Sequence, residues 1–455
     1  MVTSRKIKTA YFCSECGAEH TRWQGQCKEC NQWNSLIEEK IPVKKTAVKF
    51  SSNSNEKQVI PNIKLESYEG YKSGILEFDR VLGGQLLPGM TVLLGGEPGI
   101  GKSTLILQAA DAYSKNNLPV LYITGEESLP QIKLRANRLG IKGNLITAVN
   151  ATNLEEITQL IDSNGYKIVM IDSIQTLSSS MFDSPPGTVG QVREAANQLI
   201  NLAKSKAIAL FLIGHVTKDG MVAGPKVLEH MVDTVVYFEG DSTHLYRMLR
   251  ANKNRFGSVS EIGLFEMKPE GLTEVTNPST IFLSDNLDAT KIGSVVTAIC
   301  EGSRPILVEI QALVSSANYG NPQRVAGGFD NKRLALLLAI LEKRYDYPMA
   351  THDVFVSIAG GLKLSEPALD LPIMVAIISS LLNKPVAPDT VVTGEVGLSG
   401  EVRGVSMMDR RIIEAEKMGF KKVLLPSVNK IQIPSKKIVL NGVVNVQDAI
   451  EQVLE

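Results

Sequence analysis

The stretch GEPGIGKST, at residues 96–104, constrains the fold of this chain more than any other part of its sequence. It follows the apolar run MTVLLGG and opens the segment KSTLILQAADAY, so a strand should lead into it and a helix should leave it. Its glycines let backbone N–H groups converge on phosphate oxygens, and the start of the helix adds a favourable dipole. The pattern predicts a nucleotide-binding loop in an α/β domain.

Three more apolar runs, PVLYITG, KIVMIDS and AIALFLIGH, alternate with helix-length amphipathic segments such as GQVREAANQLINLAKSK. This alternation predicts a mostly parallel sheet covered by helices. After about Val232 the pattern changes to hairpins, and a second α/β region follows from about residue 290, with helices near 330–344, 370–383 and 408–418. A chain of 455 residues is too long for one core. We predict four segments, at residues 1–38, 39–66 (a linker that separates the first core from the next), 67–275 and 276–455.

Four cysteines near the start of the chain form two CxxC pairs separated by ten residues: Cys13, Cys16, Cys27 and Cys30. Each pair supplies two thiolates from one tight turn, which fits a tetrahedral zinc site. The alternative is two disulfides, which are disfavoured in the reducing cytoplasm, where we expect this protein. His20 lies between the pairs, but four thiolates already complete the shell. We predict one structural zinc, with Trp23 and Trp33 packed over the small core.

The residues predicted to bind nucleotide are Gly96, Glu97, Pro98, Gly99, Ile100, Gly101, Lys102, Ser103 and Thr104. Lys102 should reach the β- and γ-phosphates, and Ser103 should bind Mg²⁺. Asp172 ends an apolar strand, where a carboxylate can hold the Mg²⁺ hydration shell. The site therefore predicts ATP or GTP together with magnesium.

Two adjacent carboxylates, Glu126 and Glu127, end another predicted strand. One of them could orient or deprotonate the attacking water, which favours hydrolysis over nucleotide sensing. Either could instead cap the helix that begins near Leu129. We favour Glu126 slightly as the base.

Together these residues resemble the RecA-type ATPases, the group that includes the RecA recombinase, the DnaB helicases and the KaiC clock ATPases. The four-cysteine module, the pentapeptide KNRFG and a tail similar to part of Lon protease narrow the resemblance to the bacterial RadA (Sms) DNA repair family. The resemblance implies a zinc-binding module, a RecA-like ATPase core and a Lon-protease-like α/β domain. It also implies a ring, expected to be a hexamer, that hydrolyses ATP under stimulation by DNA and drives branch migration. Single-stranded and branched DNA and a RecA-type recombinase are the implied partners.

The resemblance gives KNRFG a role at a subunit boundary. Lys253 and Arg255 lie two residues apart on a strand-like segment, so both could point at nucleotide held by a neighbouring subunit. Asn254 should then face away, Phe256 anchor the tip and Gly257 allow the turn. A solvated hairpin tip, or a hairpin that binds DNA phosphates, is the alternative.

Two glycine-rich segments, at residues 178–194 and 214–230, fit DNA contact in the bore of such a ring. The first has Arg193 at its base, and the second carries Lys218 and Lys226. Disordered surface loops are the alternative. His215 stands where RecA-type proteins place a γ-phosphate sensor, unless it is a structural histidine.

The tail lacks the residues that a Lon-type peptidase needs. Ala368 corresponds to the nucleophilic serine and Asp409 to the activating lysine. Ser365 could be the nucleophile only if the alignment were shifted by three residues. We expect an inactive protease fold that serves assembly or DNA binding. Five cations could supply the DNA surface, although a solvated face is equally compatible: Arg403, Arg410, Arg411, Lys421 and Lys422.

Composition places few limits on function. The formal net charge is zero, so a nucleic-acid partner would have to be held by local basic patches. No apolar run is long enough to cross a bilayer, and we expect a cytoplasmic protein without membrane contact. The competing functions are a regulatory ATPase of the KaiC type that never touches DNA, and an ATP-dependent protease.

Overall fold

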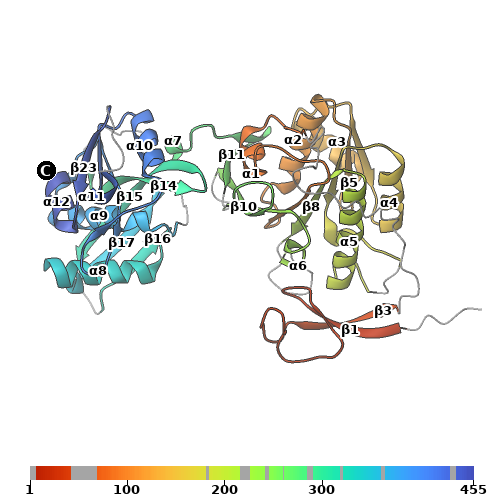
Figure 1. The fold of residues 1–455 in the computed structure, drawn as a ribbon, viewed down its shortest axis with the longest axis horizontal. Helices are drawn as coiled ribbons and strands as arrows, with labels where there is room; N and C mark the ends of the chain where they lie inside the picture. Colours follow the sequence, from red (N-terminus) through yellow and green to blue (C-terminus); the bar gives the residue numbers. More distant parts are fainter. Residues whose placement is uncertain are drawn as a thin grey trace, which may run out of the picture. The chain divides into compact units, whose positions relative to one another are not determined.

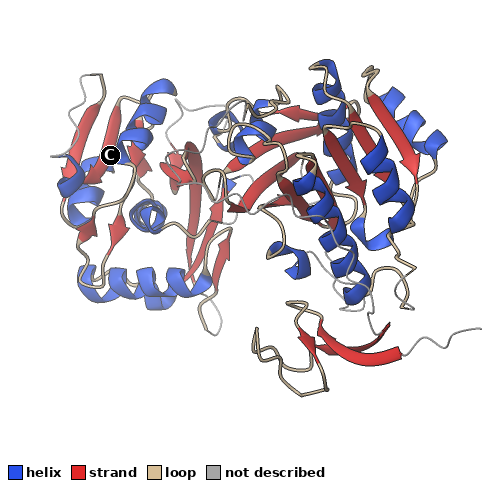
Figure 2. Ribbon diagram, turned by 45° about the vertical axis from the view of Figure 1, so that its right-hand side comes forward, coloured by secondary structure: helices blue, strands red, loops and turns tan. Residues whose placement is uncertain are grey.

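The structure is a computed structural model that describes residues 7–42, 69–180, 184–215, 226–240, 245–259, 261–283, 291–317, 321–359, 364–430 and 437–454. The chain forms two compact units, Met1–Val275 and Thr276–Glu455. Both are mixed α/β (Figures 1 and 2). Among the described residues, no helix combines the length and the apolar character needed to cross a bilayer.

The first unit begins with a three-stranded antiparallel sheet in the order β2-β1-β3. Its strands are β1 (Ile7–Cys13), β2 (Glu19–His20) and β3 (Leu36–Pro42). β3 runs through residues 39–42, which we had assigned to the linker, and residues 43–68 lie outside the described part of the chain.

A nine-stranded sheet forms the body of the first unit, in the order β12-β11-β10-β9-β4-β8-β7-β5-β6. The strands are β4 (Thr91–Gly96), β5 (Val120–Thr124), β6 (Ile146–Asn150), β7 (Ile168–Asp172), β8 (Ala209–His215), β9 (Thr234–Glu239), β10 (Tyr246–Asn254), β11 (Ile262–Lys268) and β12 (Gly271–Glu274). The six strands from β4 to β9 pair with their neighbours in parallel, whereas the strands from β9 to β12 form antiparallel pairs. The four predicted apolar runs are confirmed as β4, β5, β7 and β8; the half-exposed edge strand β6 lacks their continuous apolar pattern and was missed.

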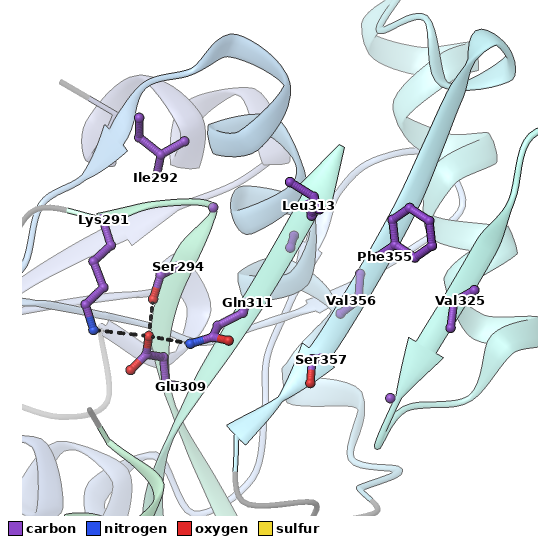
Figure 3. A pocket seen from close by; sticks show the side chains of 13 residues that line it. Lys291, Ile292, Ser294, Glu309, Gln311, Leu313, Val325, Phe355, Val356 and Ser357 are labelled. Carbon is purple, nitrogen blue, oxygen red and sulfur yellow. Dashed lines mark hydrogen bonds and ion pairs between the residues drawn. The ribbon is translucent and has the colours of Figure 1, made fainter. Parts of the chain in front are cut away.

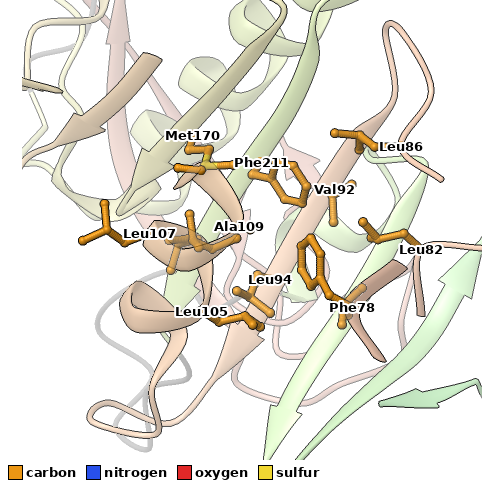
Figure 4. Close-up of a cluster of buried hydrophobic side chains, with 14 of the residues drawn as sticks. Phe78, Leu82, Leu86, Val92, Leu94, Leu105, Leu107, Ala109, Met170 and Phe211 are labelled. Carbon is orange, nitrogen blue, oxygen red and sulfur yellow. The ribbon is translucent and has the colours of Figure 1, made fainter. Parts of the chain in front are cut away.

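Helices cover both faces of this sheet. They are α1 (Leu76–Val81), α2 (Lys102–Lys115), α3 (Leu129–Arg138), α4 (Leu154–Ser163), α5 (Val189–Ser205) and α6 (Lys226–Glu229). Because side chains alternate along a strand, Leu94 and Phe211 pack with α1 and α2 (Figure 4), whereas Leu93 and Leu212 pack with α4 and α5.

The zinc module shares the second of these cores. Ala10 and Phe12 of β1 are buried in the same hydrophobic cluster as the α5 side chains, and β1 lies beside α5 in Figure 1. The Glu39 carboxylate accepts hydrogen bonds from the backbone N–H of Gly190 at 3.0 and 3.2 Å. Our expectation of two separated cores was wrong, because apolar side chains of the short β1 are buried against the larger domain.

The second unit has a seven-stranded sheet in the order β16-β17-β15-β14-β19-β22-β23. Its strands are β14 (Ser294–Glu301), β15 (Arg304–Ser316), β16 (Arg324–Gly327), β17 (His352–Ile358), β19 (Thr390–Val392), β22 (Lys422–Pro426) and β23 (Val439–Val443). The main helices are α8 (Asn331–Tyr345), α9 (Asp370–Leu382), α10 (Met408–Lys417) and α12 (Val446–Val453). Shorter elements are α7 (Ser279–Phe282), α11 (Ser427–Lys430), β13 (Lys291–Ile292), β18 (Pro385–Val386), β20 (Glu395–Val396) and β21 (Val402–Arg403). The three helices predicted here are confirmed as α8, α9 and α10.

Candidate nucleotide and zinc sites

The loop between β4 and α2 has the backbone of a phosphate-binding loop. Gly96, Gly99 and Gly101 have φ angles of 153°, 77° and 116°, which strongly favour glycine. A Cβ on Gly96 would lie 2.7 Å from the carbonyl oxygen of Phe238. No side chain caps the start of α2, so its first N–H groups are available to an anion.

Lys102, the first residue of α2, is buried inside this loop. Its ammonium donates to the carbonyl oxygens of Gly96 at 2.8 Å and Glu97 at 2.9 Å. Burial lowers the pKa of Lys102 to about 8, and the negative charges of Asp172, Glu126 and Glu97 oppose that shift. Phosphate oxygens would favour the charged form of this lysine.

Three groups meet at the carboxyl ends of β5, β7 and β8, on the P-loop side of the sheet. Ser173 Oγ donates to Glu126 Oε1 at 2.9 Å, and His215 Nε2 lies 3.6 Å from the same oxygen. Among the described residues, no hydrogen bond reaches either ring nitrogen of His215. Burial, and then the charge of Lys102, lower the pKa of His215, which favours the neutral ring. The site thus brings the side chains of Glu126 and His215 together, both close enough to Lys102 to interact with its charge.

Glu127 has a different environment from Glu126. Its carboxylate forms an ion pair with Arg135 of α3, and its backbone N–H donates to Thr124 Oγ1 at 3.0 Å. The N-cap of α3 is Ser128, so neither glutamate caps that helix. Glu127 is therefore committed to local structure, while Glu126 faces the groups around Lys102.

The donor set fits magnesium nucleotide. Asp172 ends β7 with a largely buried carboxylate, and Ser103 is the second residue of α2. Carboxylate and hydroxyl oxygens are the ligands that Mg²⁺ prefers beside phosphate. Ser103 and Asp172 are the residues that would hold the ion, directly or through water.

The four cysteines also fit their metal. Their sulfur atoms all lie within 4.8 Å of one another, with 3.6 Å between Cys13 and Cys30 and between Cys16 and Cys27. Four ligands with Zn–S bonds of 2.3 Å would stand about 3.8 Å apart. None of the four cysteines forms a disulfide, so the structure does not support the disulfide alternative. His20 Nε2 lies 3.4 Å from Cys27 Sγ, outside the four-thiolate set.

The two tryptophans of the zinc module do not pack over its core as expected. Trp23 is 57% exposed and Trp33 is 69% exposed. The buried side chains are instead Cys13, Cys27 and Leu36, because the cysteines themselves occupy much of the small interior.

The pentapeptide KNRFG lies at the end of the sheet opposite the P-loop. The backbone N–H of Arg255 donates to the carbonyl of Asp233, and Asp233 N–H donates to that of Thr91, at the start of β4. The P-loop begins at Gly96, five residues or about 17 Å further along β4. KNRFG therefore lies too far from the nucleotide site of its own chain to contact it.

The side chains of this segment depart from our expectation in three ways. The Lys253 ammonium donates to the carbonyls of Glu229 at 2.7 Å and Val232 at 2.9 Å, inside its own domain. Phe256 is 49% exposed and is not buried as an anchor would be. Gly257 has no positive φ; a Cβ there would lie 2.8 Å from Gly83 Cα, so close backbone approach requires the glycine. Of the two cations, Arg255 is the more exposed, with 57% of its side chain accessible, and its Nη1 lies 3.5 Å from Asp233 Oδ1.

The two glycine-rich segments are attached to the zinc module at their bases. Arg193 Nη1 donates to the Gly17 carbonyl at 2.6 Å, and Lys226 lies 3.4 Å from Glu15. Arg193 thus faces the zinc module. Residues 181–183 and 216–225, which include Lys218, lie outside the described residues.

The position of the missing Lon nucleophile is closed. Ala368 is buried, and two residues before it Glu366 forms an ion pair with Arg411, whose side chain is completely buried. Arg411 also donates to the Ala298 carbonyl. Arg411 therefore cannot belong to a DNA-binding surface, because its guanidinium neutralises a carboxylate in the interior of the unit. Asp409 lies in the first turn of α10.

A pocket of about 750 Å³ in this unit lies along β14, β15, β16 and β17 (Figure 3). The Glu309 carboxylate accepts from Ser294 at 2.7 Å and from Gln311 at 3.1 Å, and lies 3.4 Å from Lys291. These groups form hydrogen bonds and an ion pair with one another. Ser294 lies at the start of β14. Cys300 lies near the other end of that strand, and its backbone N–H donates to Glu366, next to the Lon-type position. The pocket is therefore separate from the closed Lon-type position.

Comparisons with known proteins agree with this architecture. Residues 64–221 match the AAA domain family, residues 331–429 match subunit ChlI of Mg-chelatase, and residues 11–38 match the rubredoxin metal binding domain. Fold and site together define a RecA-like P-loop ATPase with a four-cysteine zinc ribbon and a Lon-like C-terminal domain, as predicted. Its cofactors are structural zinc and ATP with magnesium.

The similarity extends along the whole chain. DNA repair protein RadA of Halalkalibacterium halodurans is 48% identical over 455 residues, covering 99% of both chains. That of Escherichia coli is 43% identical over 451 residues, covering 97% of this chain and 98% of its own. A solved KaiC-like protein from Pyrococcus horikoshii is 21% identical, with a TM-score of 0.38, and covers 46% of this chain and 99% of its own. The chain belongs to the RadA family of DNA repair proteins.

Proposed function

We propose that the protein is a DNA-stimulated ATPase motor that processes recombination intermediates and promotes branch migration during repair. The observation that carries this proposal is the gathering of Lys102, Asp172 and Glu126 around one P-loop. The relatives are named for DNA repair, which supports DNA as the polymer on which the motor acts.

Each residue of the site has a distinct role. Lys102 binds the β- and γ-phosphates, and the N–H groups of residues 96–104 surround them. Ser103 and Asp172 hold magnesium, which supplies charge neutralisation for the transferring phosphoryl group. Glu126 orients and deprotonates the attacking water, because the neighbouring Glu127 is held in an ion pair with Arg135. His215 senses the γ-phosphate from its place beside Glu126.

Arg255 acts on the nucleotide of an adjacent subunit. Its exposure and its distance from the P-loop of its own chain support a contribution in trans, which requires a ring; we propose a hexamer. Lys253 supports the backbone of this segment through the carbonyls it binds. We place the ring in the cytoplasm, on single-stranded and branched DNA and together with a RecA-type recombinase.

ATP turnover measured with and without single-stranded DNA tests the proposal. We expect DNA to raise the rate, and either Lys102→Ala or Asp172→Ala to abolish it. An unchanged rate would support a regulatory ATPase of the KaiC type instead. Turnover of an unfolded protein substrate would support a protease, but Ala368 leaves no nucleophile for one.

A further inference from the structure

Tyr122 of β5 is buried beneath the nucleotide site and contacts the carboxylate that ends β7. Its hydroxyl donates to Asp172 Oδ2 at 2.6 Å, and the tyrosine is 1% exposed. β5 and β7 pair in parallel, with Tyr122 opposite Met170 and Thr124 opposite Asp172. The hydroxyl therefore reaches forward by two residues, from the interior of the sheet to its carboxyl edge.

This hydrogen bond belongs to the strong class. A hydroxyl that donates to a carboxylate forms a shorter and stronger bond than one between neutral groups. Asp172 is only 8% exposed, so its charge depends on such donors and on nearby cations.

The hydrogen bond also distinguishes the two oxygens of the Asp172 carboxylate. Tyr122 engages Oδ2 and so restricts the rotation of the carboxylate that would hold magnesium. We propose that Tyr122 is a positioning residue that orients the Asp172 carboxylate for magnesium binding. This inference rests on the proposed ATPase function and adds a residue to its site.

The chain supplies a matched control. Tyr113, on α2, is also fully buried, and it belongs to the same hydrophobic cluster as Tyr122. Its hydroxyl has no hydrogen-bond partner within the described residues. Tyr122→Phe and Tyr113→Phe therefore each remove one buried hydroxyl, but only the first removes a hydrogen bond to Asp172.

The test titrates Mg²⁺ against the full-length protein and follows the affinity for a fluorescent ADP analogue. We expect Tyr122→Phe to need about tenfold more Mg²⁺ for half-maximal affinity, the effect of one lost hydrogen bond to a charged group. Its affinity in EDTA and its thermal midpoint should match those of the wild type. Tyr113→Phe should titrate like the wild type.

A double variant separates positioning from general packing. In an Asp172→Asn background, Tyr122→Phe should change the Mg²⁺ requirement no further, because its effect passes through that carboxylate. An unchanged Mg²⁺ requirement in Tyr122→Phe, or an equal shift in Tyr113→Phe, overturns the inference but leaves nucleotide binding in place. If the wild type shows no magnesium-dependent nucleotide binding, both the inference and the proposed function fail.

Discussion

Arg193, near the start of α5, donates a hydrogen bond to the carbonyl of Gly17, in the zinc-binding turn between Cys16 and Ala18. Gly17 has a φ of 70°, and a Cβ there would lie 2.7 Å from Val227 of α6. The zinc turn thus contacts a residue near the end of each glycine-rich segment, Arg193 in the first and Val227 in the second. We therefore expect loss of the metal to affect the placement of these segments.

Cys27→Ser should therefore loosen more than the zinc module. We expect loss of zinc and about fivefold faster amide hydrogen exchange at the start of α5, because Glu39 and the Gly17 carbonyl would no longer be held there. Nucleotide affinity should stay near that of the wild type. Cys300→Ser, in the second unit, serves as the control. Unchanged exchange in α5 would show that the docking does not depend on zinc.

The two adjacent glutamates should differ sharply. Glu126→Gln should lower ATP turnover by about 10²–10⁴-fold while nucleotide still binds, the range expected for loss of a general base. Glu127→Gln should lower it by less than about tenfold, because a partly exposed ion pair contributes at most about 1 kcal/mol. Steady-state turnover and nucleotide affinity measure both effects. A larger loss in Glu127→Gln would reverse the assignment.

Nucleotide affinity should fall as the pH rises above about 8. The pKa of Lys102 is lowered to about 8 from 10.5, so between these values the folded protein has lost a proton that the unfolded chain keeps. The contribution of Lys102 to the free energy of unfolding therefore rises with pH across this window. Phosphate binding favours the protonated form of Lys102. In this pH window, nucleotide binding must therefore be accompanied by the uptake of a proton. Lys102→Ala should bind nucleotide more weakly than the wild type. Its affinity should also lack the fall with rising pH when affinities at pH 7, 8 and 9 are compared.

Arg255→Ala should retain ATP binding and lose turnover. Mixing it with Lys102→Ala should restore part of the activity, since each variant supplies the group that the other lacks at a shared site. Lys268→Ala removes an exposed cation paired with Glu266 and serves as the control. Normal DNA-free turnover combined with weaker DNA binding in Arg255→Ala would instead identify KNRFG as a hairpin that binds DNA phosphates.

Arg411→Leu should strongly destabilise the second unit. Removing one partner of a buried ion pair leaves the Glu366 carboxylate uncompensated, at a cost of about 3–5 kcal/mol. The neighbouring Arg410 is exposed and donates to the Ser303 carbonyl at 2.6 Å, so Arg410→Ala should change the unfolding free energy by less than about 1.5 kcal/mol. Denaturant unfolding of the full-length chain measures both variants. Equal effects of the two would show that the Arg411 pair is not structural.

The sequence by itself determined the features encoded within short stretches. The P-loop and the CxxC pairs each need only neighbouring residues, because local backbone geometry brings their ligand groups together. The four continuous apolar runs likewise identified the central strands, since strands buried on both faces must be apolar throughout. The inactive protease site inferred from Ala368 and Asp409 stays a prediction.

The tertiary structure alone decided which distant residues meet. Tyr122 and Asp172 are 50 residues apart, Arg193 and Gly17 are 176 apart, and Arg411 and Glu366 are 45 apart. No local pattern marks such pairs, because strand order and the faces that elements bury bring them together. The same physics explains our errors at Arg411, Lys253 and the two tryptophans. A cation or an aromatic ring has the same letter whether it is buried or exposed, and only the packing around it distinguishes the two.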